Sequence, residues 1–225
     1  MIDGAKEAVG LTVIIDVFRA FSVEAYFFAK GAKAVIPVGD VELAYKLKEQ
    51  NPEMILAGER HGKILPGFDT GNSLSQLMAI DADGKTVIHT TSAGTQGIAN
   101  AVHANEILGC GLVNAGATAD YIRRSGTKEV SLVCIGLEAI TQTEEDNLCA
   151  YYIKSLLENT AIDMKSEIEK LKMTSGAKFF DKEQNKVFPK QDFYMCTELD
   201  KFDFVLKLKK GDNGMNYMKK MRMEY

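Results

Sequence analysis

The fold of this chain follows from the stretch at residues 11–22, which reads LTVIIDVFRAFS. Its first five residues are apolar or β-branched on both faces, a pattern typical of a strand buried on both sides in a parallel sheet. Asp16 follows this strand directly, and Arg19 comes three residues later. Ligands of open parallel sheets bind beyond the carboxyl ends of the strands. We therefore predict that Asp16 and Arg19 face a binding site at that edge.

Strand-like and helix-like segments alternate after this first strand. Further strands are predicted at 34–38, 54–58, 85–90, 106–108 or 112–114, and 129–135, and helices at 22–30, 41–50, 74–80, 96–104, 117–124 and 144–158. We expect Ser22, Asp40 and Ser73 to cap three of these helices. The alternation predicts an α/β fold with a mostly parallel sheet layered between helices (α/β/α).

The composition of the sequence changes after about residue 160. We therefore predict a main α/β region at 1–160, which carries the site, and a C-terminal extension at 161–225 that forms a second α/β subdomain or a lid. Within the extension, the alternation in FDFVLKLKK at 202–210 predicts a half-exposed strand, which we expect at a terminal edge. We leave open whether an edge strand precedes residue 1.

The composition limits the classes of function. A net charge of −4 and a pI near 5.5 argue against a nucleic-acid surface but not against a site for a small anion. No apolar run approaches the roughly 20 residues that span a membrane. The four cysteines include no CxxC pair, which indicates thiols in a reducing cytoplasm rather than a disulfide framework.

Polar residues follow the other predicted strands as well. Glu59 and Arg60 follow the strand at 54–58, and TTSAGT at 90–95 follows the strand at 85–90. The small residues of TTSAGT let backbone N–H groups converge on an anion, although an ordinary strand-to-helix turn has the same pattern. The acids EED at 144–146 open a helix, where carboxylates also complement the helix dipole.

The loop at 61–72 is long and rich in glycine. Its segment GFDTGN at 67–72 brings a carboxylate and an amide between glycines, which suits a functional loop and an ordinary turn equally. The three histidines show no metal-ligand spacing, and we expect none of them to be essential.

Together, the cations and N–H donors predict an anionic, phosphorylated ligand, and the carboxylates predict a divalent cation beside it. Mg²⁺ commonly takes one or two carboxylates, waters and substrate phosphate oxygens. This combination suits phosphoryl transfer or hydrolysis. Phe18 stands two residues after Asp16, so the DxDx(T/V) motif of the aspartyl phosphatases is absent.

Five motifs, in this order, resemble those of the 2-phosphosulfolactate phosphatase family. They are DVFRAFS at 16–22, GER at 58–60, GFDTGNS at 67–73, TTSAGT at 90–95 and EED at 144–146. The likeness spans residues 11–158 and continues more weakly into the tail. It implies a Mg²⁺-dependent hydrolysis of 2-phosphosulfolactate to sulfolactate and phosphate, a step toward coenzyme M.

The resemblance also implies roles for individual residues. Arg19 and Arg60 would grip the phosphate and the sulfonate, and the loop 91–95 would supply N–H donors. The expected catalytic residues are Asp16, Arg19, Glu59 and Arg60, the substrate-binding residues are Asp69, Asn72, Ser73, Thr91, Ser92, Gly94 and Thr95, and the metal ligands are Asp16, Glu145 and Asp146.

Three positions depart from the family pattern. Phe21 replaces a threonine, Leu74 a proline and Ala93 an asparagine. They leave open a phosphatase of a different hydroxy-acid phosphate, a non-catalytic anion-binding protein, and a metal-dependent lyase or isomerase. For hydrolysis we expect attack by a metal-held water, with Asp16 as a covalent nucleophile held as the alternative. The expected partner is a small phosphorylated acid; a homodimer is left open, and neither nucleic acid nor a membrane is expected.

Overall fold

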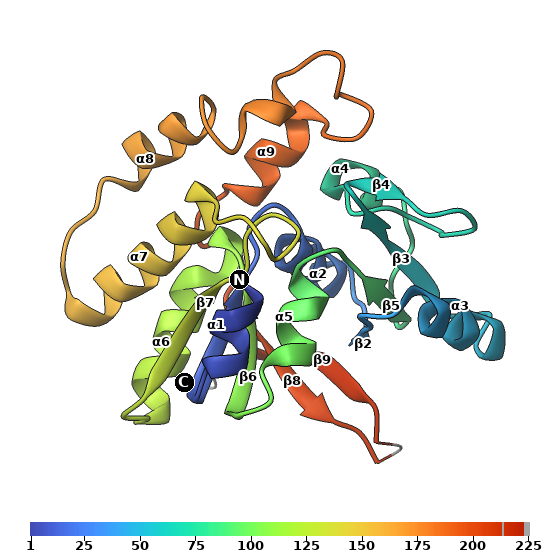
Figure 1. Ribbon diagram of the computed structural model, residues 1–225, viewed down its shortest axis with the longest axis horizontal. Coiled ribbons are helices and arrows are strands. Elements are labelled where there is room, and N and C mark those ends of the chain that lie inside the picture. Colours follow the sequence, from blue (N-terminus) through green and yellow to red (C-terminus); the bar gives the residue numbers. More distant parts are fainter. Residues whose placement is uncertain (213, 223–225) are drawn as a thin grey trace.

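The computed structural model describes residues 1–212 and 214–222 of the chain. Its strands are β1 (Gly10–Ile15), β2 (Ala34–Pro37), β3 (Ile55–Arg60), β4 (Lys63–Ile64), β5 (Thr86–Thr90), β6 (Ala104–Cys110), β7 (Val130–Cys134), β8 (Phe204–Lys210) and β9 (Asn216–Arg222). Within the described residues they form one sheet in the order β4-β3-β5-β2-β9-β8-β6-β1-β7 (Figure 1). The predicted α/β class is confirmed.

The sheet contains two parallel blocks. In one block β1 lies between β6 and β7, and in the other β5 lies between β2 and β3, in each case with parallel pairing. All six residues of β1 are buried, as the apolar run on both faces predicted. The carboxyl ends of β1, β3 and β5 are therefore the places where polar side chains can leave the core together.

A C-terminal hairpin joins the two blocks. β8 and β9 pair antiparallel with each other, β8 pairs with β6, and β9 pairs with β2. We expected the strand at 202–210 at a terminal edge, and the structure places it in the centre of the sheet instead. The physical reason is burial, because Phe204, Val205 and Leu206 are all in the core although the sequence pattern alternates. The division of the chain at residue 160 stays a prediction.

Helices flank the sheet (Figure 1). They are α1 (Ile2–Glu7), α2 (Ala20–Ala29), α3 (Val41–Gln50), α4 (Leu74–Leu77), α5 (Gly94–Asn100), α6 (Ala115–Ser125), α7 (Glu144–Glu158), α8 (Met164–Leu171) and α9 (Lys190–Cys196), with 3₁₀ turns at Leu112–Asn114 and Ala177–Phe179. The predicted caps Asp40 and Ser73 are confirmed, since each side chain accepts an N–H of the helix that follows. No helix in the described part of the chain has the length and apolar character needed to cross a membrane.

The helix after β1 differs from the prediction. It begins at Ala20 rather than after Ser22, and its N-cap is Arg19. The carboxylate of Asp16 makes this early start possible, because its Oδ1 accepts the N–H of Ala20 at 3.0 Å. Ser22 lies inside the helix, fully buried, and its hydroxyl donates to the carbonyl of Val17. The predicted cap at Ser22 is therefore wrong, and Asp16 partly fills that role.

The segment from α8 to α9 lies across one end of the molecule. In Figure 1 it runs along the top, in orange, beyond the ends of α7 and α2. α9 contacts α4 and the 3₁₀ turn at Leu112–Asn114, and α8 contacts α7. This segment therefore covers part of the sheet edge at which the strand-end residues emerge.

Candidate active site

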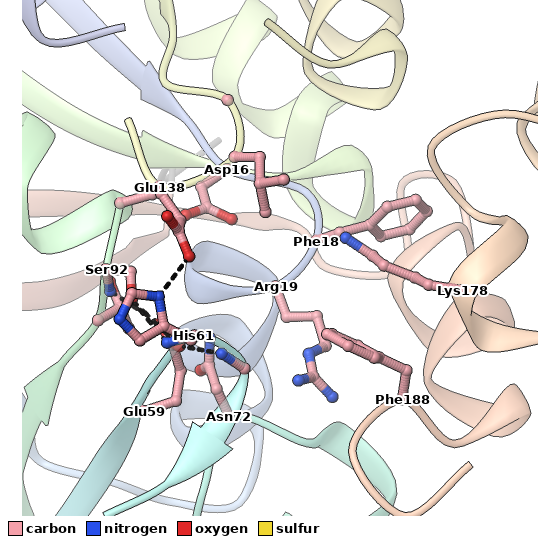
Figure 2. A pocket seen from close by; sticks show the side chains of 15 residues that line it. Asp16, Phe18, Arg19, Glu59, His61, Asn72, Ser92, Glu138, Lys178 and Phe188 are labelled. Atoms are coloured by element: carbon pink, nitrogen blue, oxygen red, sulfur yellow. Dashed lines mark hydrogen bonds and ion pairs between the residues drawn. The ribbon is translucent and has the colours of Figure 1, made fainter. Parts of the chain in front are cut away.

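A cavity of about 130 Å³ lies at the carboxyl ends of β1, β3 and β5, under the segment between α8 and α9 (Figure 2). Its wall combines strand-end residues with residues from two distant loops. The lining residues are Asp16, Phe18, Arg19, Glu59, His61, Gly62, Asn72, Thr91, Ser92, Ala93, Gly136, Leu137, Glu138, Lys178 and Phe188. Six of the residues predicted from sequence (Asp16, Arg19, Glu59, Asn72, Thr91 and Ser92) thus meet in one place.

Asp16 is the carboxylate at the end of β1. Burial, helped by the nearby carboxylates of Glu59 and Glu145, raises its pKa to about 7, although the N–H of Ala20 acts in the opposite direction. The start of α5 comes close to this side chain because residue 94 is a glycine: a Cβ at that position would lie 3.0 Å from Asp16 Oδ2. Gly94 therefore borders the site through its small size, although it does not line the cavity.

Asp146 and Glu145 lie behind Asp16, in the first turn of α7, and differ in what holds them. Asp146 accepts two backbone N–H groups, from Val17 at 2.9 Å and from Gly136 at 2.8 Å. Glu145 has an oxygen, Oε2, that is buried without a hydrogen-bond partner in the described structure. Burial raises the pKa of both carboxyl groups. Asp146 thus fixes two loops of the site, whereas Glu145 keeps an oxygen available.

Arg19 is a buried cation held by the C-terminal segment. Its Nη1 donates to Asp192 Oδ2 at 2.8 Å and to the carbonyl of Val187 at 3.0 Å. Its guanidinium lies 4.9 Å from the ring centroid of Phe188. Asp192 is itself fully buried and accepts the N–H and hydroxyl of Ser75 through its other oxygen. A buried arginine with one side facing the cavity is a ready partner for an anion.

Lys178 is a second cation in the cavity, which the sequence analysis missed. It enters from the side opposite Glu59 and Ser92, beside Phe18 and Phe188 (Figure 2). Burial lowers its pKa and the charge of Arg19 acts in the same direction, whereas the carboxylates of Glu145 and Asp16 raise it. The only sequence signal is the motif SGAKFF at 175–180, a lysine between small and aromatic residues.

Glu59 ties the strand ends together. Its carboxylate accepts the N–H of Ser92 at 2.7 Å and that of Gly62 at 2.6 Å. β3 reaches this position because residue 58 is a glycine with φ of +147°, at a place where a Cβ would lie only 2.0 Å from the carbonyl oxygen of Thr90. Glu59 therefore occupies N–H donors that we expected to serve the ligand. These contacts hold the loop in shape, and the catalytic role of Glu59 stays a prediction.

The loop Thr91–Thr95 keeps fewer donors for an anion than its sequence indicates. Thr91 and Thr95 each donate their backbone N–H to the other's hydroxyl, at 3.1 and 3.2 Å. Thr95 thereby lies behind the loop, outside the cavity lining. Within the described residues, the N–H groups of Ala93 and Gly94 have no partner, and Ala93 lines the cavity.

Three other predicted residues lie outside the cavity. The guanidinium of Arg60 donates to the carbonyl of Gly39 and to the hydroxyl of Thr90. Asp69 accepts the N–H of Leu56 and pairs with Lys48 on the surface, which together hold its pKa below the ordinary value despite partial burial. Ser73 caps α4 and lines a neighbouring cavity of about 180 Å³.

The three residues that depart from the family pattern lie in different places. Phe21 packs in the core near Gly109, where a Cβ would lie 2.4 Å from its ring, and Leu74 is fully buried as well. Only Ala93 of these three lines the cavity. Phe21 and Leu74 therefore do not reach the cavity themselves.

Two of the histidines lie at or behind the cavity. Nδ1 of His61 lies 2.6 Å from Glu138 Oε1, and both residues line the cavity near solvent (Figure 2). His89 is fully buried behind the cavity, where it contacts Asn72 and Glu24. Its position in the strand is the one predicted, but its polar contacts were not.

The carboxylates present fit a magnesium ion. In residues 1–212 and 214–222, no three His, Cys, Asp or Glu side chains gather in the arrangement of a metal site. Mg²⁺ needs only one or two carboxylates when waters and substrate phosphate oxygens complete its shell. Asp16 in the cavity wall and Glu145 with its unpartnered Oε2 meet that requirement. Asp146, with both oxygens bound to backbone N–H groups, is committed elsewhere.

Comparison with known proteins bears on this site. A family model described as 2-phosphosulpholactate phosphatase matches residues 2–211. A protein of Bacillus subtilis (strain 168) is 32% identical, over 88% of this chain and 87% of its own. One of Caldanaerobacter subterraneus subsp. tengcongensis is 34% identical, over 88% of each chain, and one of Thermoplasma volcanium is 31% identical, over 90% and 92%. Each relative is named probable 2-phosphosulfolactate phosphatase.

Proposed function

Since this chain belongs to the 2-phosphosulfolactate phosphatase family, we propose that it is a Mg²⁺-dependent phosphatase that hydrolyses 2-phosphosulfolactate to sulfolactate and phosphate. One observation carries the proposal. The cavity brings the carboxylate of Asp16 together with two cations, Arg19 and Lys178, at the carboxyl edge of the sheet. Phosphoryl transfer needs this combination, because catalysis consists mainly of positioning and of neutralising charge on the transferred group.

The two cations indicate the charge of the ligand. Arg19 and Lys178 lie on the same side of the cavity, against aromatic rings that limit their hydration. A substrate with a phosphate and a second anionic group matches two such cations. Arg19 is fixed by Asp192 before the substrate arrives, so little reorganisation is needed when the anion binds.

The carboxylates set the place of the metal. Asp16 and Glu145 are the residues that would hold Mg²⁺ in this proposal. When bound, the ion would draw charge from the phosphate oxygens and favour attack at phosphorus. Asp146 and Glu59 contribute indirectly, by holding the backbone of the loops around the cavity through their N–H contacts.

Two routes to hydrolysis remain distinct in this site. In one, a water attacks phosphorus while Asp16 orients it. In the other, a carboxylate oxygen of Asp16 attacks first and forms an aspartyl phosphate. The configuration at phosphorus separates the routes, measured with a phosphorothioate analogue of the substrate that is made chiral by oxygen isotopes and hydrolysed in isotope-labelled water. Inversion would show a single attack by water, and net retention would show two displacements through an aspartyl phosphate.

The proposal is tested by phosphate release from a panel of phosphorylated hydroxy acids with Mg²⁺, including 2-phosphosulfolactate, phospholactate and phosphoglycerate. The expected result is turnover of 2-phosphosulfolactate that EDTA abolishes and added Mg²⁺ restores. Turnover of another member in preference would keep the reaction and change the substrate. Saturable binding with no release from any member would show an anion-binding protein instead.

The place of action is part of the proposal. The four cysteines are free, and the buried sulfurs of Cys110 and Cys149 lie 4.0 Å apart without a bond between them. Thiols in this state are typical of a reducing compartment, so we infer a cytoplasmic location.

A further inference from the structure

A buried polar chain of three residues lies behind the cavity. Nδ1 of His89 lies 2.9 Å from Glu24 Oε1, and Nε2 of His89 lies 3.1 Å from Asn72 Oδ1. Glu24 and His89 are fully buried, and Asn72 is 6% exposed where it meets the cavity. The residues come from α2, β5 and the loop before α4, so three parts of the fold converge on one amide.

The hydrogen bonds fix where the protons lie. Asn72 Oδ1 can only accept, so Nε2 of His89 must carry a proton. The contact between Nδ1 and Glu24 needs one further proton, on either atom. The pair is then neutral overall, as imidazolium with carboxylate or as imidazole with carboxylic acid. A buried site favours this neutral state, and Oε2 of Glu24, which is buried without a partner, is less costly when the pair carries no net charge.

The opposite arrangement of the amide has a different charge. If Asn72 pointed its NH₂ group at His89, Nε2 would have to accept, and the proton of the ring would lie on Nδ1. Glu24 would then be a carboxylate with a neutral histidine, which leaves a net negative charge in the core. The oxygen of Asn72 would face the cavity, where it would repel an anion.

We propose that Glu24 and His89 are positioning residues that turn the amide of Asn72, so that its NH₂ group donates to an anionic oxygen of the substrate. The inference rests on the proposed function for the identity of that substrate. Asn72 also lines the neighbouring cavity of about 180 Å³, as does Arg19. Asn72 and Arg19 therefore border both spaces.

The first test reads the protons directly. The chain has three histidines, so long-range ¹H–¹⁵N spectra of ¹⁵N-histidine protein can be assigned with the His61→Gln and His103→Gln variants. His89 is expected to carry a proton on Nε2 in the wild-type protein. An Nε2 that lacks a proton would overturn the proposal, since the amide oxygen would then have no donor. The wild-type spectrum gives this answer even if a His89 variant fails to fold.

The second test uses the two products, inorganic phosphate and sulfolactate, as probes. Asn72→Asp keeps the oxygen that faces His89 and puts a second oxygen in place of the NH₂ group. We expect it to weaken binding of at least one product roughly ten- to hundredfold, and Asn72→Ala to weaken it less. A structural role alone would give the reverse order, because alanine removes the contact with His89. His103→Gln, at an exposed position outside the site, is the matched control.

The outcomes separate the two proposals. Wild-type protein that releases phosphate from 2-phosphosulfolactate, while Asn72→Ala binds both products normally, would overturn this inference alone. Wild-type protein that neither releases phosphate nor binds either product would overturn the proposed function, and with it the ligand named here. Product binding that is weakened more by Asn72→Asp than by Asn72→Ala, together with a protonated Nε2 of His89, would support both proposals.

Discussion

The cavity has two walls of different origin. One is formed by strand ends, where Asp16, Glu59 and the loop 91–93 sit on the central sheet. The other comes from the segment 178–188, which begins within the 3₁₀ turn Ala177–Phe179, continues as irregular chain, and contributes Lys178 and Phe188. The first wall supplies carboxylates and backbone donors, and the second supplies a cation and an aromatic surface. The anion site therefore depends on how the strand ends and the segment 178–188 are held together.

Arg19 joins the walls. It belongs to the strand-end wall by sequence, yet its hydrogen bonds go to Asp192 and Val187 of the C-terminal segment. The clustered rings of Phe18, Phe179 and Phe193 add an apolar contact at the same junction. Variants on each wall and at the junction should thus have different effects, and four of them test the comparison.

The largest effect is expected for Arg19→Ala, at the junction. It leaves the carboxylate of Asp192 buried without its cation, which typically costs about 3–5 kcal/mol of unfolding free energy. Turnover should be lost as well. Urea unfolding followed by circular dichroism measures the first effect. Lys170→Ala, which breaks an exposed pair with Glu167, is the control and should cost less than about 1 kcal/mol. Full stability in Arg19→Ala would mean that the walls are joined by other contacts.

Asp16→Asn tests the strand-end wall. Its kcat should fall by about 10²–10³, because a preorganised charge at the reacting group is lost. The melting temperature should stay the same or rise, since an asparagine oxygen still accepts from Ala20 and repulsion with Glu145 is relieved. Asp146→Asn is the matched control. It replaces an acceptor of a backbone N–H by a donor, and should destabilise by about 1–3 kcal/mol. An Asp16→Asn protein that unfolds would make Asp16 a structural residue.

Lys178→Met tests the second wall. The side chain keeps its apolar contacts with the aromatic rings and loses its charge, so KM should rise roughly ten- to hundredfold while kcat changes less. Steady-state kinetics at fixed ionic strength measure this. Lys182→Met removes an exposed charge from the same segment and should leave both constants unchanged. A fall in kcat alone for Lys178→Met would place the lysine at the reacting atoms rather than at a bound anion.

The smallest effect is expected for His61→Ala, at the solvent side of the cavity. His61 and Glu138 form an exposed pair between two loops, and such pairs contribute about 0–1 kcal/mol. The melting temperature and kcat should both change little. A large fall in kcat would show that His61 transfers a proton. The solvent side of the cavity would then carry a catalytic group that the two walls do not include.

Much of the strand-end wall could be predicted from sequence, because its signals are local. The apolar run 11–15 followed by Asp16 shows both the strand and its end, and α7 begins and ends at the predicted residues, Glu144 and Glu158. Side-chain direction is harder to predict. Arg60 follows the same strand as Glu59, but neighbouring residues of a strand point to opposite faces, and its guanidinium binds Gly39 and Thr90 outside the cavity.

The second wall could not be predicted, because it depends on contacts between residues far apart in the chain. Lys178 and Phe188 lie in a stretch without strand or helix periodicity, and Asp192 becomes important only through Arg19. The same holds for His89, which lies in an apolar strand and gains its role from Glu24 and Asn72. Periodicity shows which face of a segment is buried, but not which polar group it meets there.

The central position of the β8–β9 hairpin has a consequence for how the protein folds. β8 and β9 follow all the other described strands in the chain, yet both parallel blocks pair with them. During synthesis, the strands of each parallel block can pair with one another early. The two blocks cannot be joined into one sheet until the hairpin has left the ribosome. Pairings of this kind, such as Val35 with Met218, join residues that are far apart in sequence and slow the folding of a chain. The two halves of the nascent sheet thus each expose an edge until the hairpin has been synthesised, which makes this the stage at which the chain most needs protection from aggregation.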